Sequence, residues 1–303
     1  MIEKLKIAKL KGELFISKIK ILMFIILLIF EVAIISFFLI ENKIIKVAPS
    51  GPKIAVINFN KEVTDKYVNK IMEDLDEALE TKEYKEILFI MNSPGGSPTA
   101  SEELSEYLKE INKKIKVTMY IQSIAASGGY YIASSIKPLI TNKNAIIGSI
   151  GVIMPHYNFE RLANKVGVEE DDLSAGEYKK PISMLSKITD KNKDYLTKQM
   201  LKPMYDNFLE SVATNRGITI KKLKPLAEGR IYMGNSKEIK GILIDKISTL
   251  YFIKKDIKNR YKGKIKFYNI IKKNPSGLFG AKTKLDLNLN IDSFLKNNME
   301  LMR

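Results

Sequence analysis

The sequence predicts an α/β fold with a parallel sheet and crossover helices, preceded by one N-terminal transmembrane helix. Strand-like apolar segments alternate with amphipathic helical segments between residues 53 and 153, an order that favours parallel pairing. Two glycine-rich corners follow strand-like segments, at positions where sheets of this class form their sites. Twenty nearly continuous apolar residues, Ile21–Ile40, lie near the N-terminus and are long enough to cross a bilayer as a helix.

Composition excludes several classes of chemistry. The 303 residues include no cysteine and a single histidine, His156, which excludes disulfides, thiolate nucleophiles, cysteine zinc sites and mechanisms that need two imidazoles. We expect neither a metal nor a cofactor. The formal net charge of +16 raises nucleic acid or an acidic membrane as partners. The lysines are spread through the chain without a nucleic-acid-binding module, so we interpret them as solvated surface and expect no nucleic-acid partner.

The N-terminal segment predicts a membrane anchor. Residues 1–20 carry six lysines against two glutamates, and residues 21–40 contain one central carboxylate, Glu31. Its cost of about 3 kcal/mol is outweighed by apolar side chains that each favour insertion by about 0.3–0.6 kcal/mol. The apolar segment exceeds the ~7–15 residues of a cleavable signal peptide, and no small-residue cleavage site follows it. We therefore expect an uncleaved anchor in contact with membrane lipid, with residues 1–20 in the cytoplasm and residues 41–303 outside.

Hydrophobic periodicity defines the elements of the folded part. The continuous apolar run Lys53–Phe59 is typical of a buried strand, and the spacing of Val68, Ile71 and Leu75 is typical of a helix. The same reasoning predicts further strands at 86–91, 115–121, 138–141 and 145–153, and helices at 64–81, 99–111, 130–136, 158–166 and 190–216. Residues 172–181 are expected to be extended, and residues 228–245 to hold a turn, a helix and a last strand.

Changes in composition predict the domain boundaries. Residues 41–52 are interpreted as a linker because they contain prolines and a glycine, and residues 53–252 as the folded domain. Between residues 254 and 273 nine basic residues stand against one acid. Residues 253–303 are therefore predicted to form a basic, mobile tail.

The two glycine-rich corners point to a reactive serine. Ser127 lies between a predicted strand and a predicted helix and is followed by two glycines, which let a backbone approach closely. Free N–H groups at the helix start would lie beside its hydroxyl and favour a developing oxyanion. The corner Pro94–Gly96 follows strand 86–91, so both corners can face one cleft. The simpler interpretations are that Ser127 caps the helix and that Pro94–Gly96 is a tight turn.

A serine nucleophile needs a base. His156, twenty-nine residues after Ser127, is the one imidazole, but its neighbours carry no special signal, and a surface histidine is the simpler interpretation. A lysine that is buried in an apolar pocket without an anion loses its proton and can act instead. Composition alone does not choose among the many lysines.

Four motifs together resemble the signal peptide peptidase A family in its short form, with one domain per chain. They are Asn92–Ser97, Ala126–Tyr130, Gly148–Val152 and Gly176–Lys179. The resemblance covers roughly Ile54–Asp245 and includes Gly229–Gly234. It implies a membrane-anchored serine endopeptidase of crotonase/Clp protease-like fold, built from repeated β-β-α units. It further implies that the chain degrades remnant signal peptides and other hydrophobic polypeptides outside the cytoplasm.

The resemblance also implies roles for individual residues. It makes Ser127 the nucleophile, Lys179 the general base and Ser149 the residue that positions the lysine. It places the oxyanion donors at the backbone N–H groups of Gly95, Gly96 and Gly128. Lys180 is interpreted as a solvated charge, because adjacent side chains of an extended segment point to opposite faces.

Assembly and two other classes of function stay open. The resembling family forms homo-oligomeric rings, and whether Ser127 and Lys179 of one site come from the same chain stays undecided. A crotonase-like acyl-CoA enzyme would use the same oxyanion corners but would have no use for Ser127. An inactive scaffold that binds peptides is the other class, and a Ser-His-Asp peptidase using His156 is the alternative mechanism.

Overall fold

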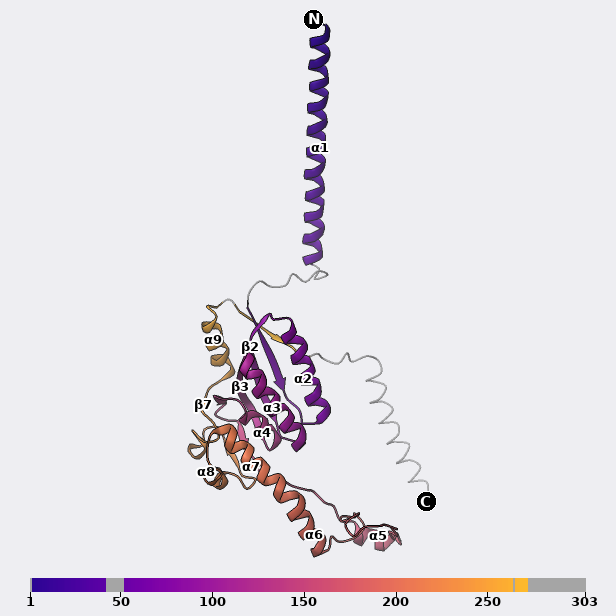
Figure 1. Cartoon of the computed structure of the whole chain (residues 1–303), viewed down its shortest axis with the longest axis vertical. Coiled ribbons are helices and arrows are strands. Elements are labelled where there is room, and N and C mark those ends of the chain that lie inside the picture. Colours follow the sequence, from indigo (N-terminus) through magenta and orange to yellow (C-terminus); the bar gives the residue numbers. More distant parts are fainter. Residues whose placement is uncertain (1, 42–51, 264, 272–303) are drawn as a thin grey trace. The chain divides into compact units, whose positions relative to one another are not determined.

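The computed structural model describes residues 2–41, 52–263 and 265–271, and their contacts divide the chain into two units, 1–51 and 52–303. The first unit contains the helix α1, Ile2–Glu41 (Figure 1). Its stretch Leu14–Phe38 is long and apolar enough to cross a membrane, and it is the one such helix among the described residues. A membrane anchor and a signal sequence share these properties. The predicted linker, residues 41–52, lies almost entirely outside the described residues.

The second unit is built on an eight-stranded sheet (Figure 1). The strand order is β6-β5-β3-β2-β1-β8, with β4 pairing both β3 and β7, and every pairing except β5–β6 is parallel. The strands are β1 Lys53–Phe59, β2 Tyr84–Ser93, β3 Lys116–Ala126, β4 Leu139–Thr141, β5 Ile146–Gly148, β6 Ile231–Met233, β7 Lys246–Ile247 and β8 Lys266–Asn269. The predicted α/β class with parallel strands and crossover helices is confirmed.

Helices connect the strands and cover both faces of the sheet. They are α2 Asp65–Glu80, α3 Pro98–Lys114, α4 Gly128–Ser134, α5 Glu160–Val166, α6 Asp190–Leu196, α7 Lys202–Arg216, α8 Ile220–Leu223 and α9 Leu250–Arg260. A π-helical turn, Thr197–Leu201, joins α6 to α7, so the predicted long helix over 190–216 is continuous. Short 3₁₀ turns are found at Lys224–Leu226 and Lys237–Ile239.

Alternate residues of the central strands pack into two separate cores. In β1, Ala55 and Ile57 face the larger core, which includes apolar residues of α2, α3, α4 and α7. Ile54 and Val56 face the opposite way and pack with Ile253 and Ile257 of α9. This is the two-residue period of a strand that is buried on both faces, and it explains why the strand sequences are apolar throughout.

The predicted tail boundary at residue 253 does not match this packing. Ile253 and Ile257 are buried against the sheet, and β8 pairs in parallel with β1 as an edge strand. A lysine-rich composition hides this because the two buried residues of α9, Ile253 and Ile257, lie one turn apart with solvated lysines between them. Residues 272–303, the remainder of the predicted tail, lie outside the described residues.

The central strand β3 changes neighbours along its length. It pairs with β4 at Met119–Ile121 and then with β5 at Ile124–Ala126. On its other side the register with β2 shifts between Met91 and Ser93, where β3 holds two extra residues. Such a bulge bends a strand and re-aims the residues that come after it. The strand therefore extends to Ala126, past the predicted end at residue 121, and delivers the chain directly to Ser127.

An ion pair between the buried Arg216 and the half-buried Asp245 fixes the end of α7, which packs against α4. Arg216 Nη2 donates to Asp245 Oδ1 at 2.7 Å, and Arg216 Nε donates to the Ile242 carbonyl. The other Asp245 oxygen accepts from the Leu139 N–H at the start of β4. Burial acts to raise the pKa of Asp245, but the hydrogen bonds from Arg216 and Leu139 outweigh it and hold that pKa below its ordinary range.

Because of this ion pair, we expect the free energy of unfolding to fall at acid pH. Because the folded-state pKa of Asp245 lies below its unfolded value, the stabilisation is complete above about pH 4 and is lost as pH falls through the folded-state value. We expect Asp245→Asn to cost about 2 kcal/mol at pH 7, since it leaves the buried Arg216 without a charged partner. The fall in unfolding free energy between pH 7 and pH 3 should also be smaller in Asp245→Asn than in the wild type. Thermal unfolding of the detergent-solubilised chain at pH 7 and pH 3, followed by near-ultraviolet circular dichroism, measures both effects.

The matched control is Asp194→Asn, which removes an exposed carboxylate paired with Lys198 and the same unit of charge. We expect its unfolding temperature to follow that of the wild type at both pH values. Parallel acid curves for Asp245→Asn and the wild type would contradict the prediction.

Candidate active site at the carboxyl end of the sheet

Ser127 occupies a strained corner between β3 and α4. Its backbone has φ 51° and ψ −126°, a left-handed conformation that is rare for a residue with a side chain. The Ser127 N–H donates to the Gly148 carbonyl of β5 at 2.9 Å, which holds the corner against the sheet. Although Ser127 stands at the N-cap position of α4, its side chain makes no capping hydrogen bond. The residue is half-buried, and its geometry does not support the simpler interpretation of a cap.

The corner that follows β2 lies directly against Ser127. Gly95 has φ 112°, and a Cβ on it would lie 2.7 Å from the Ser127 Cβ and 2.8 Å from the Ala126 carbonyl oxygen. Gly96 has φ 146°, and a Cβ there would lie 2.2 Å from the Val63 carbonyl oxygen. Only glycine fits either position. The two corners therefore face each other across the carboxyl end of the sheet, as parallel pairing of β2 and β3 predicts.

Two backbone N–H groups next to Ser127 make no hydrogen bond among the described residues. Gly96 and Gly128 have no hydrogen-bond acceptor for their N–H groups in the part of the chain that the structure describes. They are close together, since a Cβ on Gly128 would lie 3.4 Å from the Gly96 nitrogen. The Gly95 N–H differs, because it donates to the buried Ser93 Oγ at 3.2 Å. The start of α4 adds its positive dipole end to this corner.

Two residues that hold this corner were not singled out from the sequence. Val63 bonds both sides of Gly96, accepting from the Ser97 N–H and donating to the Gly95 carbonyl, each at 2.8 Å. Ser93 is fully buried and orients the Gly95 peptide. Ser93 lies inside the motif Asn92–Ser97, so a serine directly before Pro-Gly-Gly was the available signal, whereas the Val63 contact is visible only in three dimensions.

Ser149 lies close to Ser127 along the backbone of β5. It follows Gly148, whose carbonyl accepts the Ser127 N–H, and it has φ 53°. Its own N–H donates to the Arg230 carbonyl at 2.6 Å, next to β6. The predicted strand over 145–153 ends at Gly148 because Gly148 and Ser149 both turn into positive φ. The structure thus brings Ser127, Ser149 and the three glycines to one place.

The arm, which we define as residues 151–189, carries Lys179. Ala163 is its one buried residue, and Lys179 is exposed. The predicted extended segment 172–181 is wrong at its centre, because Gly176–Lys179 forms a turn in which the Lys179 N–H donates to the Gly176 carbonyl at 3.1 Å. Gly176 at φ 102° permits that turn. Among the described residues no hydrogen bond, ion pair or ring contact joins the arm to Ser127.

The neighbours of Lys179 are held to α6 and within the arm. Tyr178 stacks on Tyr195 of α6 with ring centroids 4.2 Å apart. Lys180 pairs with Glu170 at 2.6 Å and with Asp172, which agrees with its interpretation as a solvated charge. These contacts leave Lys179 itself without an acidic partner in the described part of the chain.

His156 also lies in the arm. It is half-buried, and its Nε2 is enclosed without a hydrogen-bond partner among the described residues. Within the same residues, no hydrogen bond links it to Ser127. Nor does any group of three or more histidine or carboxylate side chains in this part of the chain lie where it could hold a metal ion.

Comparison with known proteins identifies relatives that are named as proteases. Over 172 residues the chain is 36% identical to a Synechocystis protein named as a candidate protease, a match that covers 57% of this chain and 61% of the relative. It is 31% identical over 210 residues to a candidate signal peptide peptidase SppA of Enterococcus faecium, covering 68% and 60%. It is 32% identical over 207 residues to Protease 4 of Haemophilus influenzae, covering 65% and 33%.

The family region contains the Ser127 corner, Ser149 and Lys179, while the Gly95–Gly96 corner precedes it. The chain spans about 60% of the length of the first two relatives. The model of peptidase family S49 matches residues 109–262, which contain Ser127, Ser149 and Lys179. The resemblance inferred from the four motifs is thereby confirmed. Because this match covers more than half of the 303 residues, the chain belongs to peptidase family S49.

Proposed function

We propose that the chain is a membrane-anchored serine endopeptidase in which Ser127 is the nucleophile and Lys179 the general base. The observation that carries the proposal is the strained Ser127 corner, where the side chain makes no capping hydrogen bond and two backbone N–H groups, unused among the described residues, lie close together. Strain of this kind persists where the surrounding structure holds it, and it is common at reactive centres. Membership of peptidase family S49 supports the same chemistry.

The glycine corners are suited to stabilise the tetrahedral intermediate. When Ser127 Oγ attacks a peptide carbonyl, the carbonyl oxygen becomes an oxyanion that needs donors already in place. We assign these donors to the N–H groups of Gly96 and Gly128, which are unused among the described residues. Gly95 has a supporting role, since its own N–H is bonded to Ser93 and its missing side chain lets the corner approach Ser127.

Lys179 needs a second surface before it can act as a base. A lysine takes a proton only when neutral, and that requires burial away from water. Lys179 is exposed in the single chain. The arm around it also exposes apolar side chains that water does not favour: Ile153, Tyr157, Leu162, Val166 and Leu173. We therefore propose a homo-oligomeric ring in which the arm of one chain covers the site of its neighbour and supplies the lysine.

The reaction then runs in two acyl-transfer steps. Neutral Lys179 takes the Ser127 proton as the Oγ–carbonyl bond forms, and the resulting ammonium protonates the departing amine as the peptide bond breaks. Water next gives a proton to the neutral lysine as its oxygen attacks the ester carbonyl. The lysine ammonium then returns this proton to Ser127 Oγ as the ester bond breaks and the acid leaves. Ser149, next to the residue that binds the Ser127 N–H, is placed to receive the lysine amine and orient it.

The proposed substrates and location follow from the anchor. The lysines of residues 1–20 favour a cytoplasmic N-terminus, which puts residues 52–303 outside the cytoplasm. Remnant signal peptides and other hydrophobic polypeptides are released in that setting, and the exposed apolar residues of the arm suit such substrates. The relative named as a signal peptide peptidase supports this choice.

Substitution of the proposed dyad tests the mechanism. We expect Ser127→Ala and Lys179→Ala each to lower the hydrolysis of a hydrophobic fluorogenic peptide by about a thousandfold or more, since either loss removes a group that reacts. Lys180→Ala is the matched control, because it removes a neighbouring charge that is already paired with carboxylates. Full activity of Lys179→Ala together with loss in His156→Ala would move the base to the histidine. A wild type that neither cleaves peptides nor reacts with a fluorophosphonate would favour a peptide-binding scaffold.

Mixing the two inactive variants tests the origin of the lysine. If neighbours supply Lys179, co-expressed Ser127→Ala and Lys179→Ala chains rebuild complete sites at about a quarter of their interfaces, the fraction expected for random assembly around a ring. We therefore expect about a quarter of the wild-type activity in the co-purified mixture. Separately purified variants at the same total concentration serve as the control. Activity that stays at the level of the single variants would place Ser127 and Lys179 of each site in one chain.

The packing of the two corners gives a further test. In Gly95→Ala the added methyl group would lie 2.7 Å from Ser127 Cβ, so Ser127 must move. We expect a loss of kcat of about a hundredfold, the size of effect produced by misplacing reacting groups by about 1 Å. The control is Gly167→Ala, another left-handed glycine (φ 73°) with open space around its Cβ position. A kcat in Gly95→Ala no lower than in Gly167→Ala would remove the corner contact from the mechanism.

A further inference from the structure

Each of the four adjacent parallel strands β8, β1, β2 and β3 carries a lysine at its amino end. Lys53 begins β1 and is in register with Lys266, which begins β8. Lys85 is the second residue of β2, and Lys116 begins β3 in register with the next residue of β2. Since neighbouring strands lie about 4.8 Å apart, the backbones of these four residues span about 15 Å, and we call the four residues the lysine row. It lies at the amino edge of the sheet, opposite the edge that carries Ser127.

Three lysines of the row and four more around it are exposed and have no acidic partner among the described residues. The exposed lysines of this edge that lack one are Lys82, Lys85, Lys114, Lys116, Lys258, Lys262 and Lys266. The carboxylates here are fewer. Glu83 pairs with Lys53, and Glu86 is fully buried and pairs with Arg260, while Glu80 stays exposed. The edge therefore presents a surface of uncompensated positive charge.

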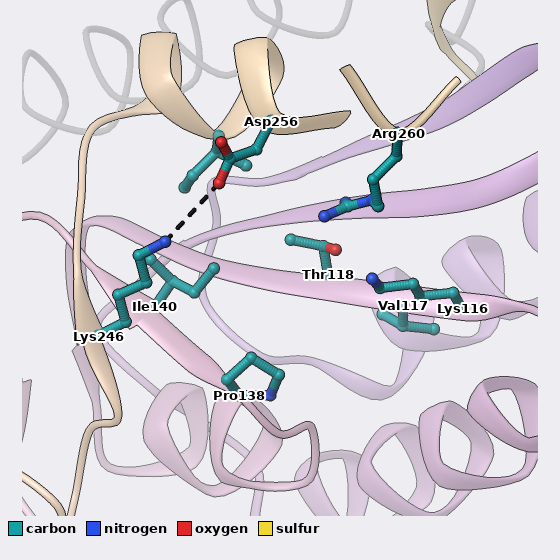
Figure 2. A pocket seen from close by; sticks show the side chains of 9 residues that line it. Lys116, Val117, Thr118, Pro138, Ile140, Lys246, Asp256 and Arg260 are labelled. Atoms are coloured by element: carbon teal, nitrogen blue, oxygen red, sulfur yellow. Dashed lines mark ion pairs between the residues drawn. The ribbon is translucent and has the colours of Figure 1, made fainter. Parts of the chain in front are cut away.

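A hollow beside Lys116 adds a recess to this surface (Figure 2). Its volume is about 140 Å³, and Lys116 and Arg260 approach it on either side of Thr118. Arg260 uses its Nη2 to bind Glu86 at 2.7 Å, and across the hollow Lys246 lies 3.7 Å from Asp256. Three cationic side chains line the hollow; Glu86 balances Arg260 and Asp256 lies beside Lys246, so Lys116 supplies the unbalanced positive charge. A negatively charged group of modest size suits such a recess.

Ordinary helix electrostatics explains only part of this arrangement. Lysines near helix C-termini, such as Lys114 in α3 and Lys258 in α9, stabilise the helix dipole. Strands have almost no such dipole, so it gives no reason for Lys85, Lys116 and Lys266. Lys266 lies directly opposite Lys53, a like charge on the neighbouring strand that would cost free energy, and Glu83 offsets it by pairing with Lys53.

The carboxyl end of the sheet, which carries Ser127, also has negatively charged side chains. Asp65 begins α2, and Glu102 and Glu103 lie in the first half of α3, all at the carboxyl end of the sheet. Exposed Lys61, Lys66 and Lys143 lie at that end too, so its charges are mixed, whereas the unpaired charges of the amino edge are mostly positive. A charge distribution of this kind orients a protein over a charged surface.

The chain order limits where the lysine row can lie. Residues 42–51 separate α1 from the described start of the second unit at Pro52, and Lys53 follows immediately. Ten residues bridge no more than about 35 Å even when fully extended. If α1 enters a membrane, the amino edge of the sheet is therefore always within reach of its surface, and it is the edge with the unbalanced positive charge.

We propose that the lysine row and the adjoining hollow dock on anionic lipid headgroups of the membrane that anchors the chain. The proposal rests on the membrane anchorage proposed above and is independent of the catalytic assignment. Docking in this way directs the Ser127 edge away from the headgroups. Each lysine near an anionic surface strengthens binding roughly fivefold, so three lysines change the ratio of docked to undocked chains by about a hundredfold.

Energy transfer in lipid nanodiscs tests the proposal on the full chain. The chain contains no cysteine, so a donor dye can be placed on a single exposed position of the amino edge in Asn259→Cys, or of the opposite edge in Asn144→Cys. Acceptor dye is carried on the lipid headgroups. Discs of phosphatidylcholine are compared with discs that contain about 30% phosphatidylglycerol, at low and high salt, because screening weakens attraction to a charged surface.

We expect transfer from position 259 to rise in anionic discs, to fall at high salt, and to exceed transfer from position 144. Lys85→Gln, Lys116→Gln and Lys266→Gln combined should abolish the rise. The control combines Lys221→Gln, Lys222→Gln and Lys237→Gln, which remove the same charge from exposed lysines elsewhere, and it should keep the rise. Hydrolysis of a soluble peptide by the lysine-row variant should stay at the wild-type level, which separates docking from catalysis.

Equal transfer from position 259 in the two kinds of disc overturns the proposal and reassigns the lysine row to a soluble acidic partner. A rise that survives in the lysine-row variant also overturns it, because the attraction would then come from other charges. Co-elution of the chain with the discs is scored separately. A chain that does not enter them contradicts the anchorage, and with it the docking that rests on that anchorage.

Discussion

The close approach of two backbone corners is the constraint on which the rest of the site depends. The Gly95 backbone lies so near Ser127 that a single methyl group would fill the space between them. This approach requires two parallel strands to end side by side, and it requires β3 to run long enough to reach the corner of β2. Backbone atoms, not side chains, therefore set the positions of the nucleophile and of the unused N–H groups around it. A site of this kind keeps its geometry as long as the sheet is intact.

The support for this corner comes from elements far away in the sequence. Tyr130 of α4 donates to the Leu243 carbonyl at 2.8 Å, and burial raises its pKa, which keeps the phenol a neutral donor. Tyr131 donates to Ser211 of α7 at 2.7 Å and packs against Phe208. The helix that begins at Ser127 is thus clamped from two sides, and α7 is in turn fixed by the Arg216–Asp245 pair. These contacts keep Ser127 in a strained backbone conformation that it would otherwise leave.

Local patterns in the sequence were sufficient for the strands β1 to β5 and for the two corners. The run Lys53–Phe59 matches β1 at both ends, and the helix expected at 64–81 matches α2 within one residue at each end. The tail boundary failed because it depends on long-range pairing. β8 forms only because β1 offers it an edge more than two hundred residues earlier in the chain, and no local pattern reveals such a partner. The turn at Gly176–Lys179 was missed for the opposite reason, since a short tight turn inside a polar segment leaves no periodicity to read.

The pairing of β1 with β8 also sets the order in which the second unit can be completed. β1 is the first strand to leave the ribosome and β8 the last, so one edge of β1 waits unpaired while every intervening element is made. At about 5–20 residues per second that wait is on the order of ten to forty seconds. Throughout it, Ile54 and Val56 also lack the cover that α9 later provides. Newly made chains therefore carry an exposed apolar strand edge during synthesis, which is the form in which parallel-sheet proteins most readily associate wrongly and recruit chaperones.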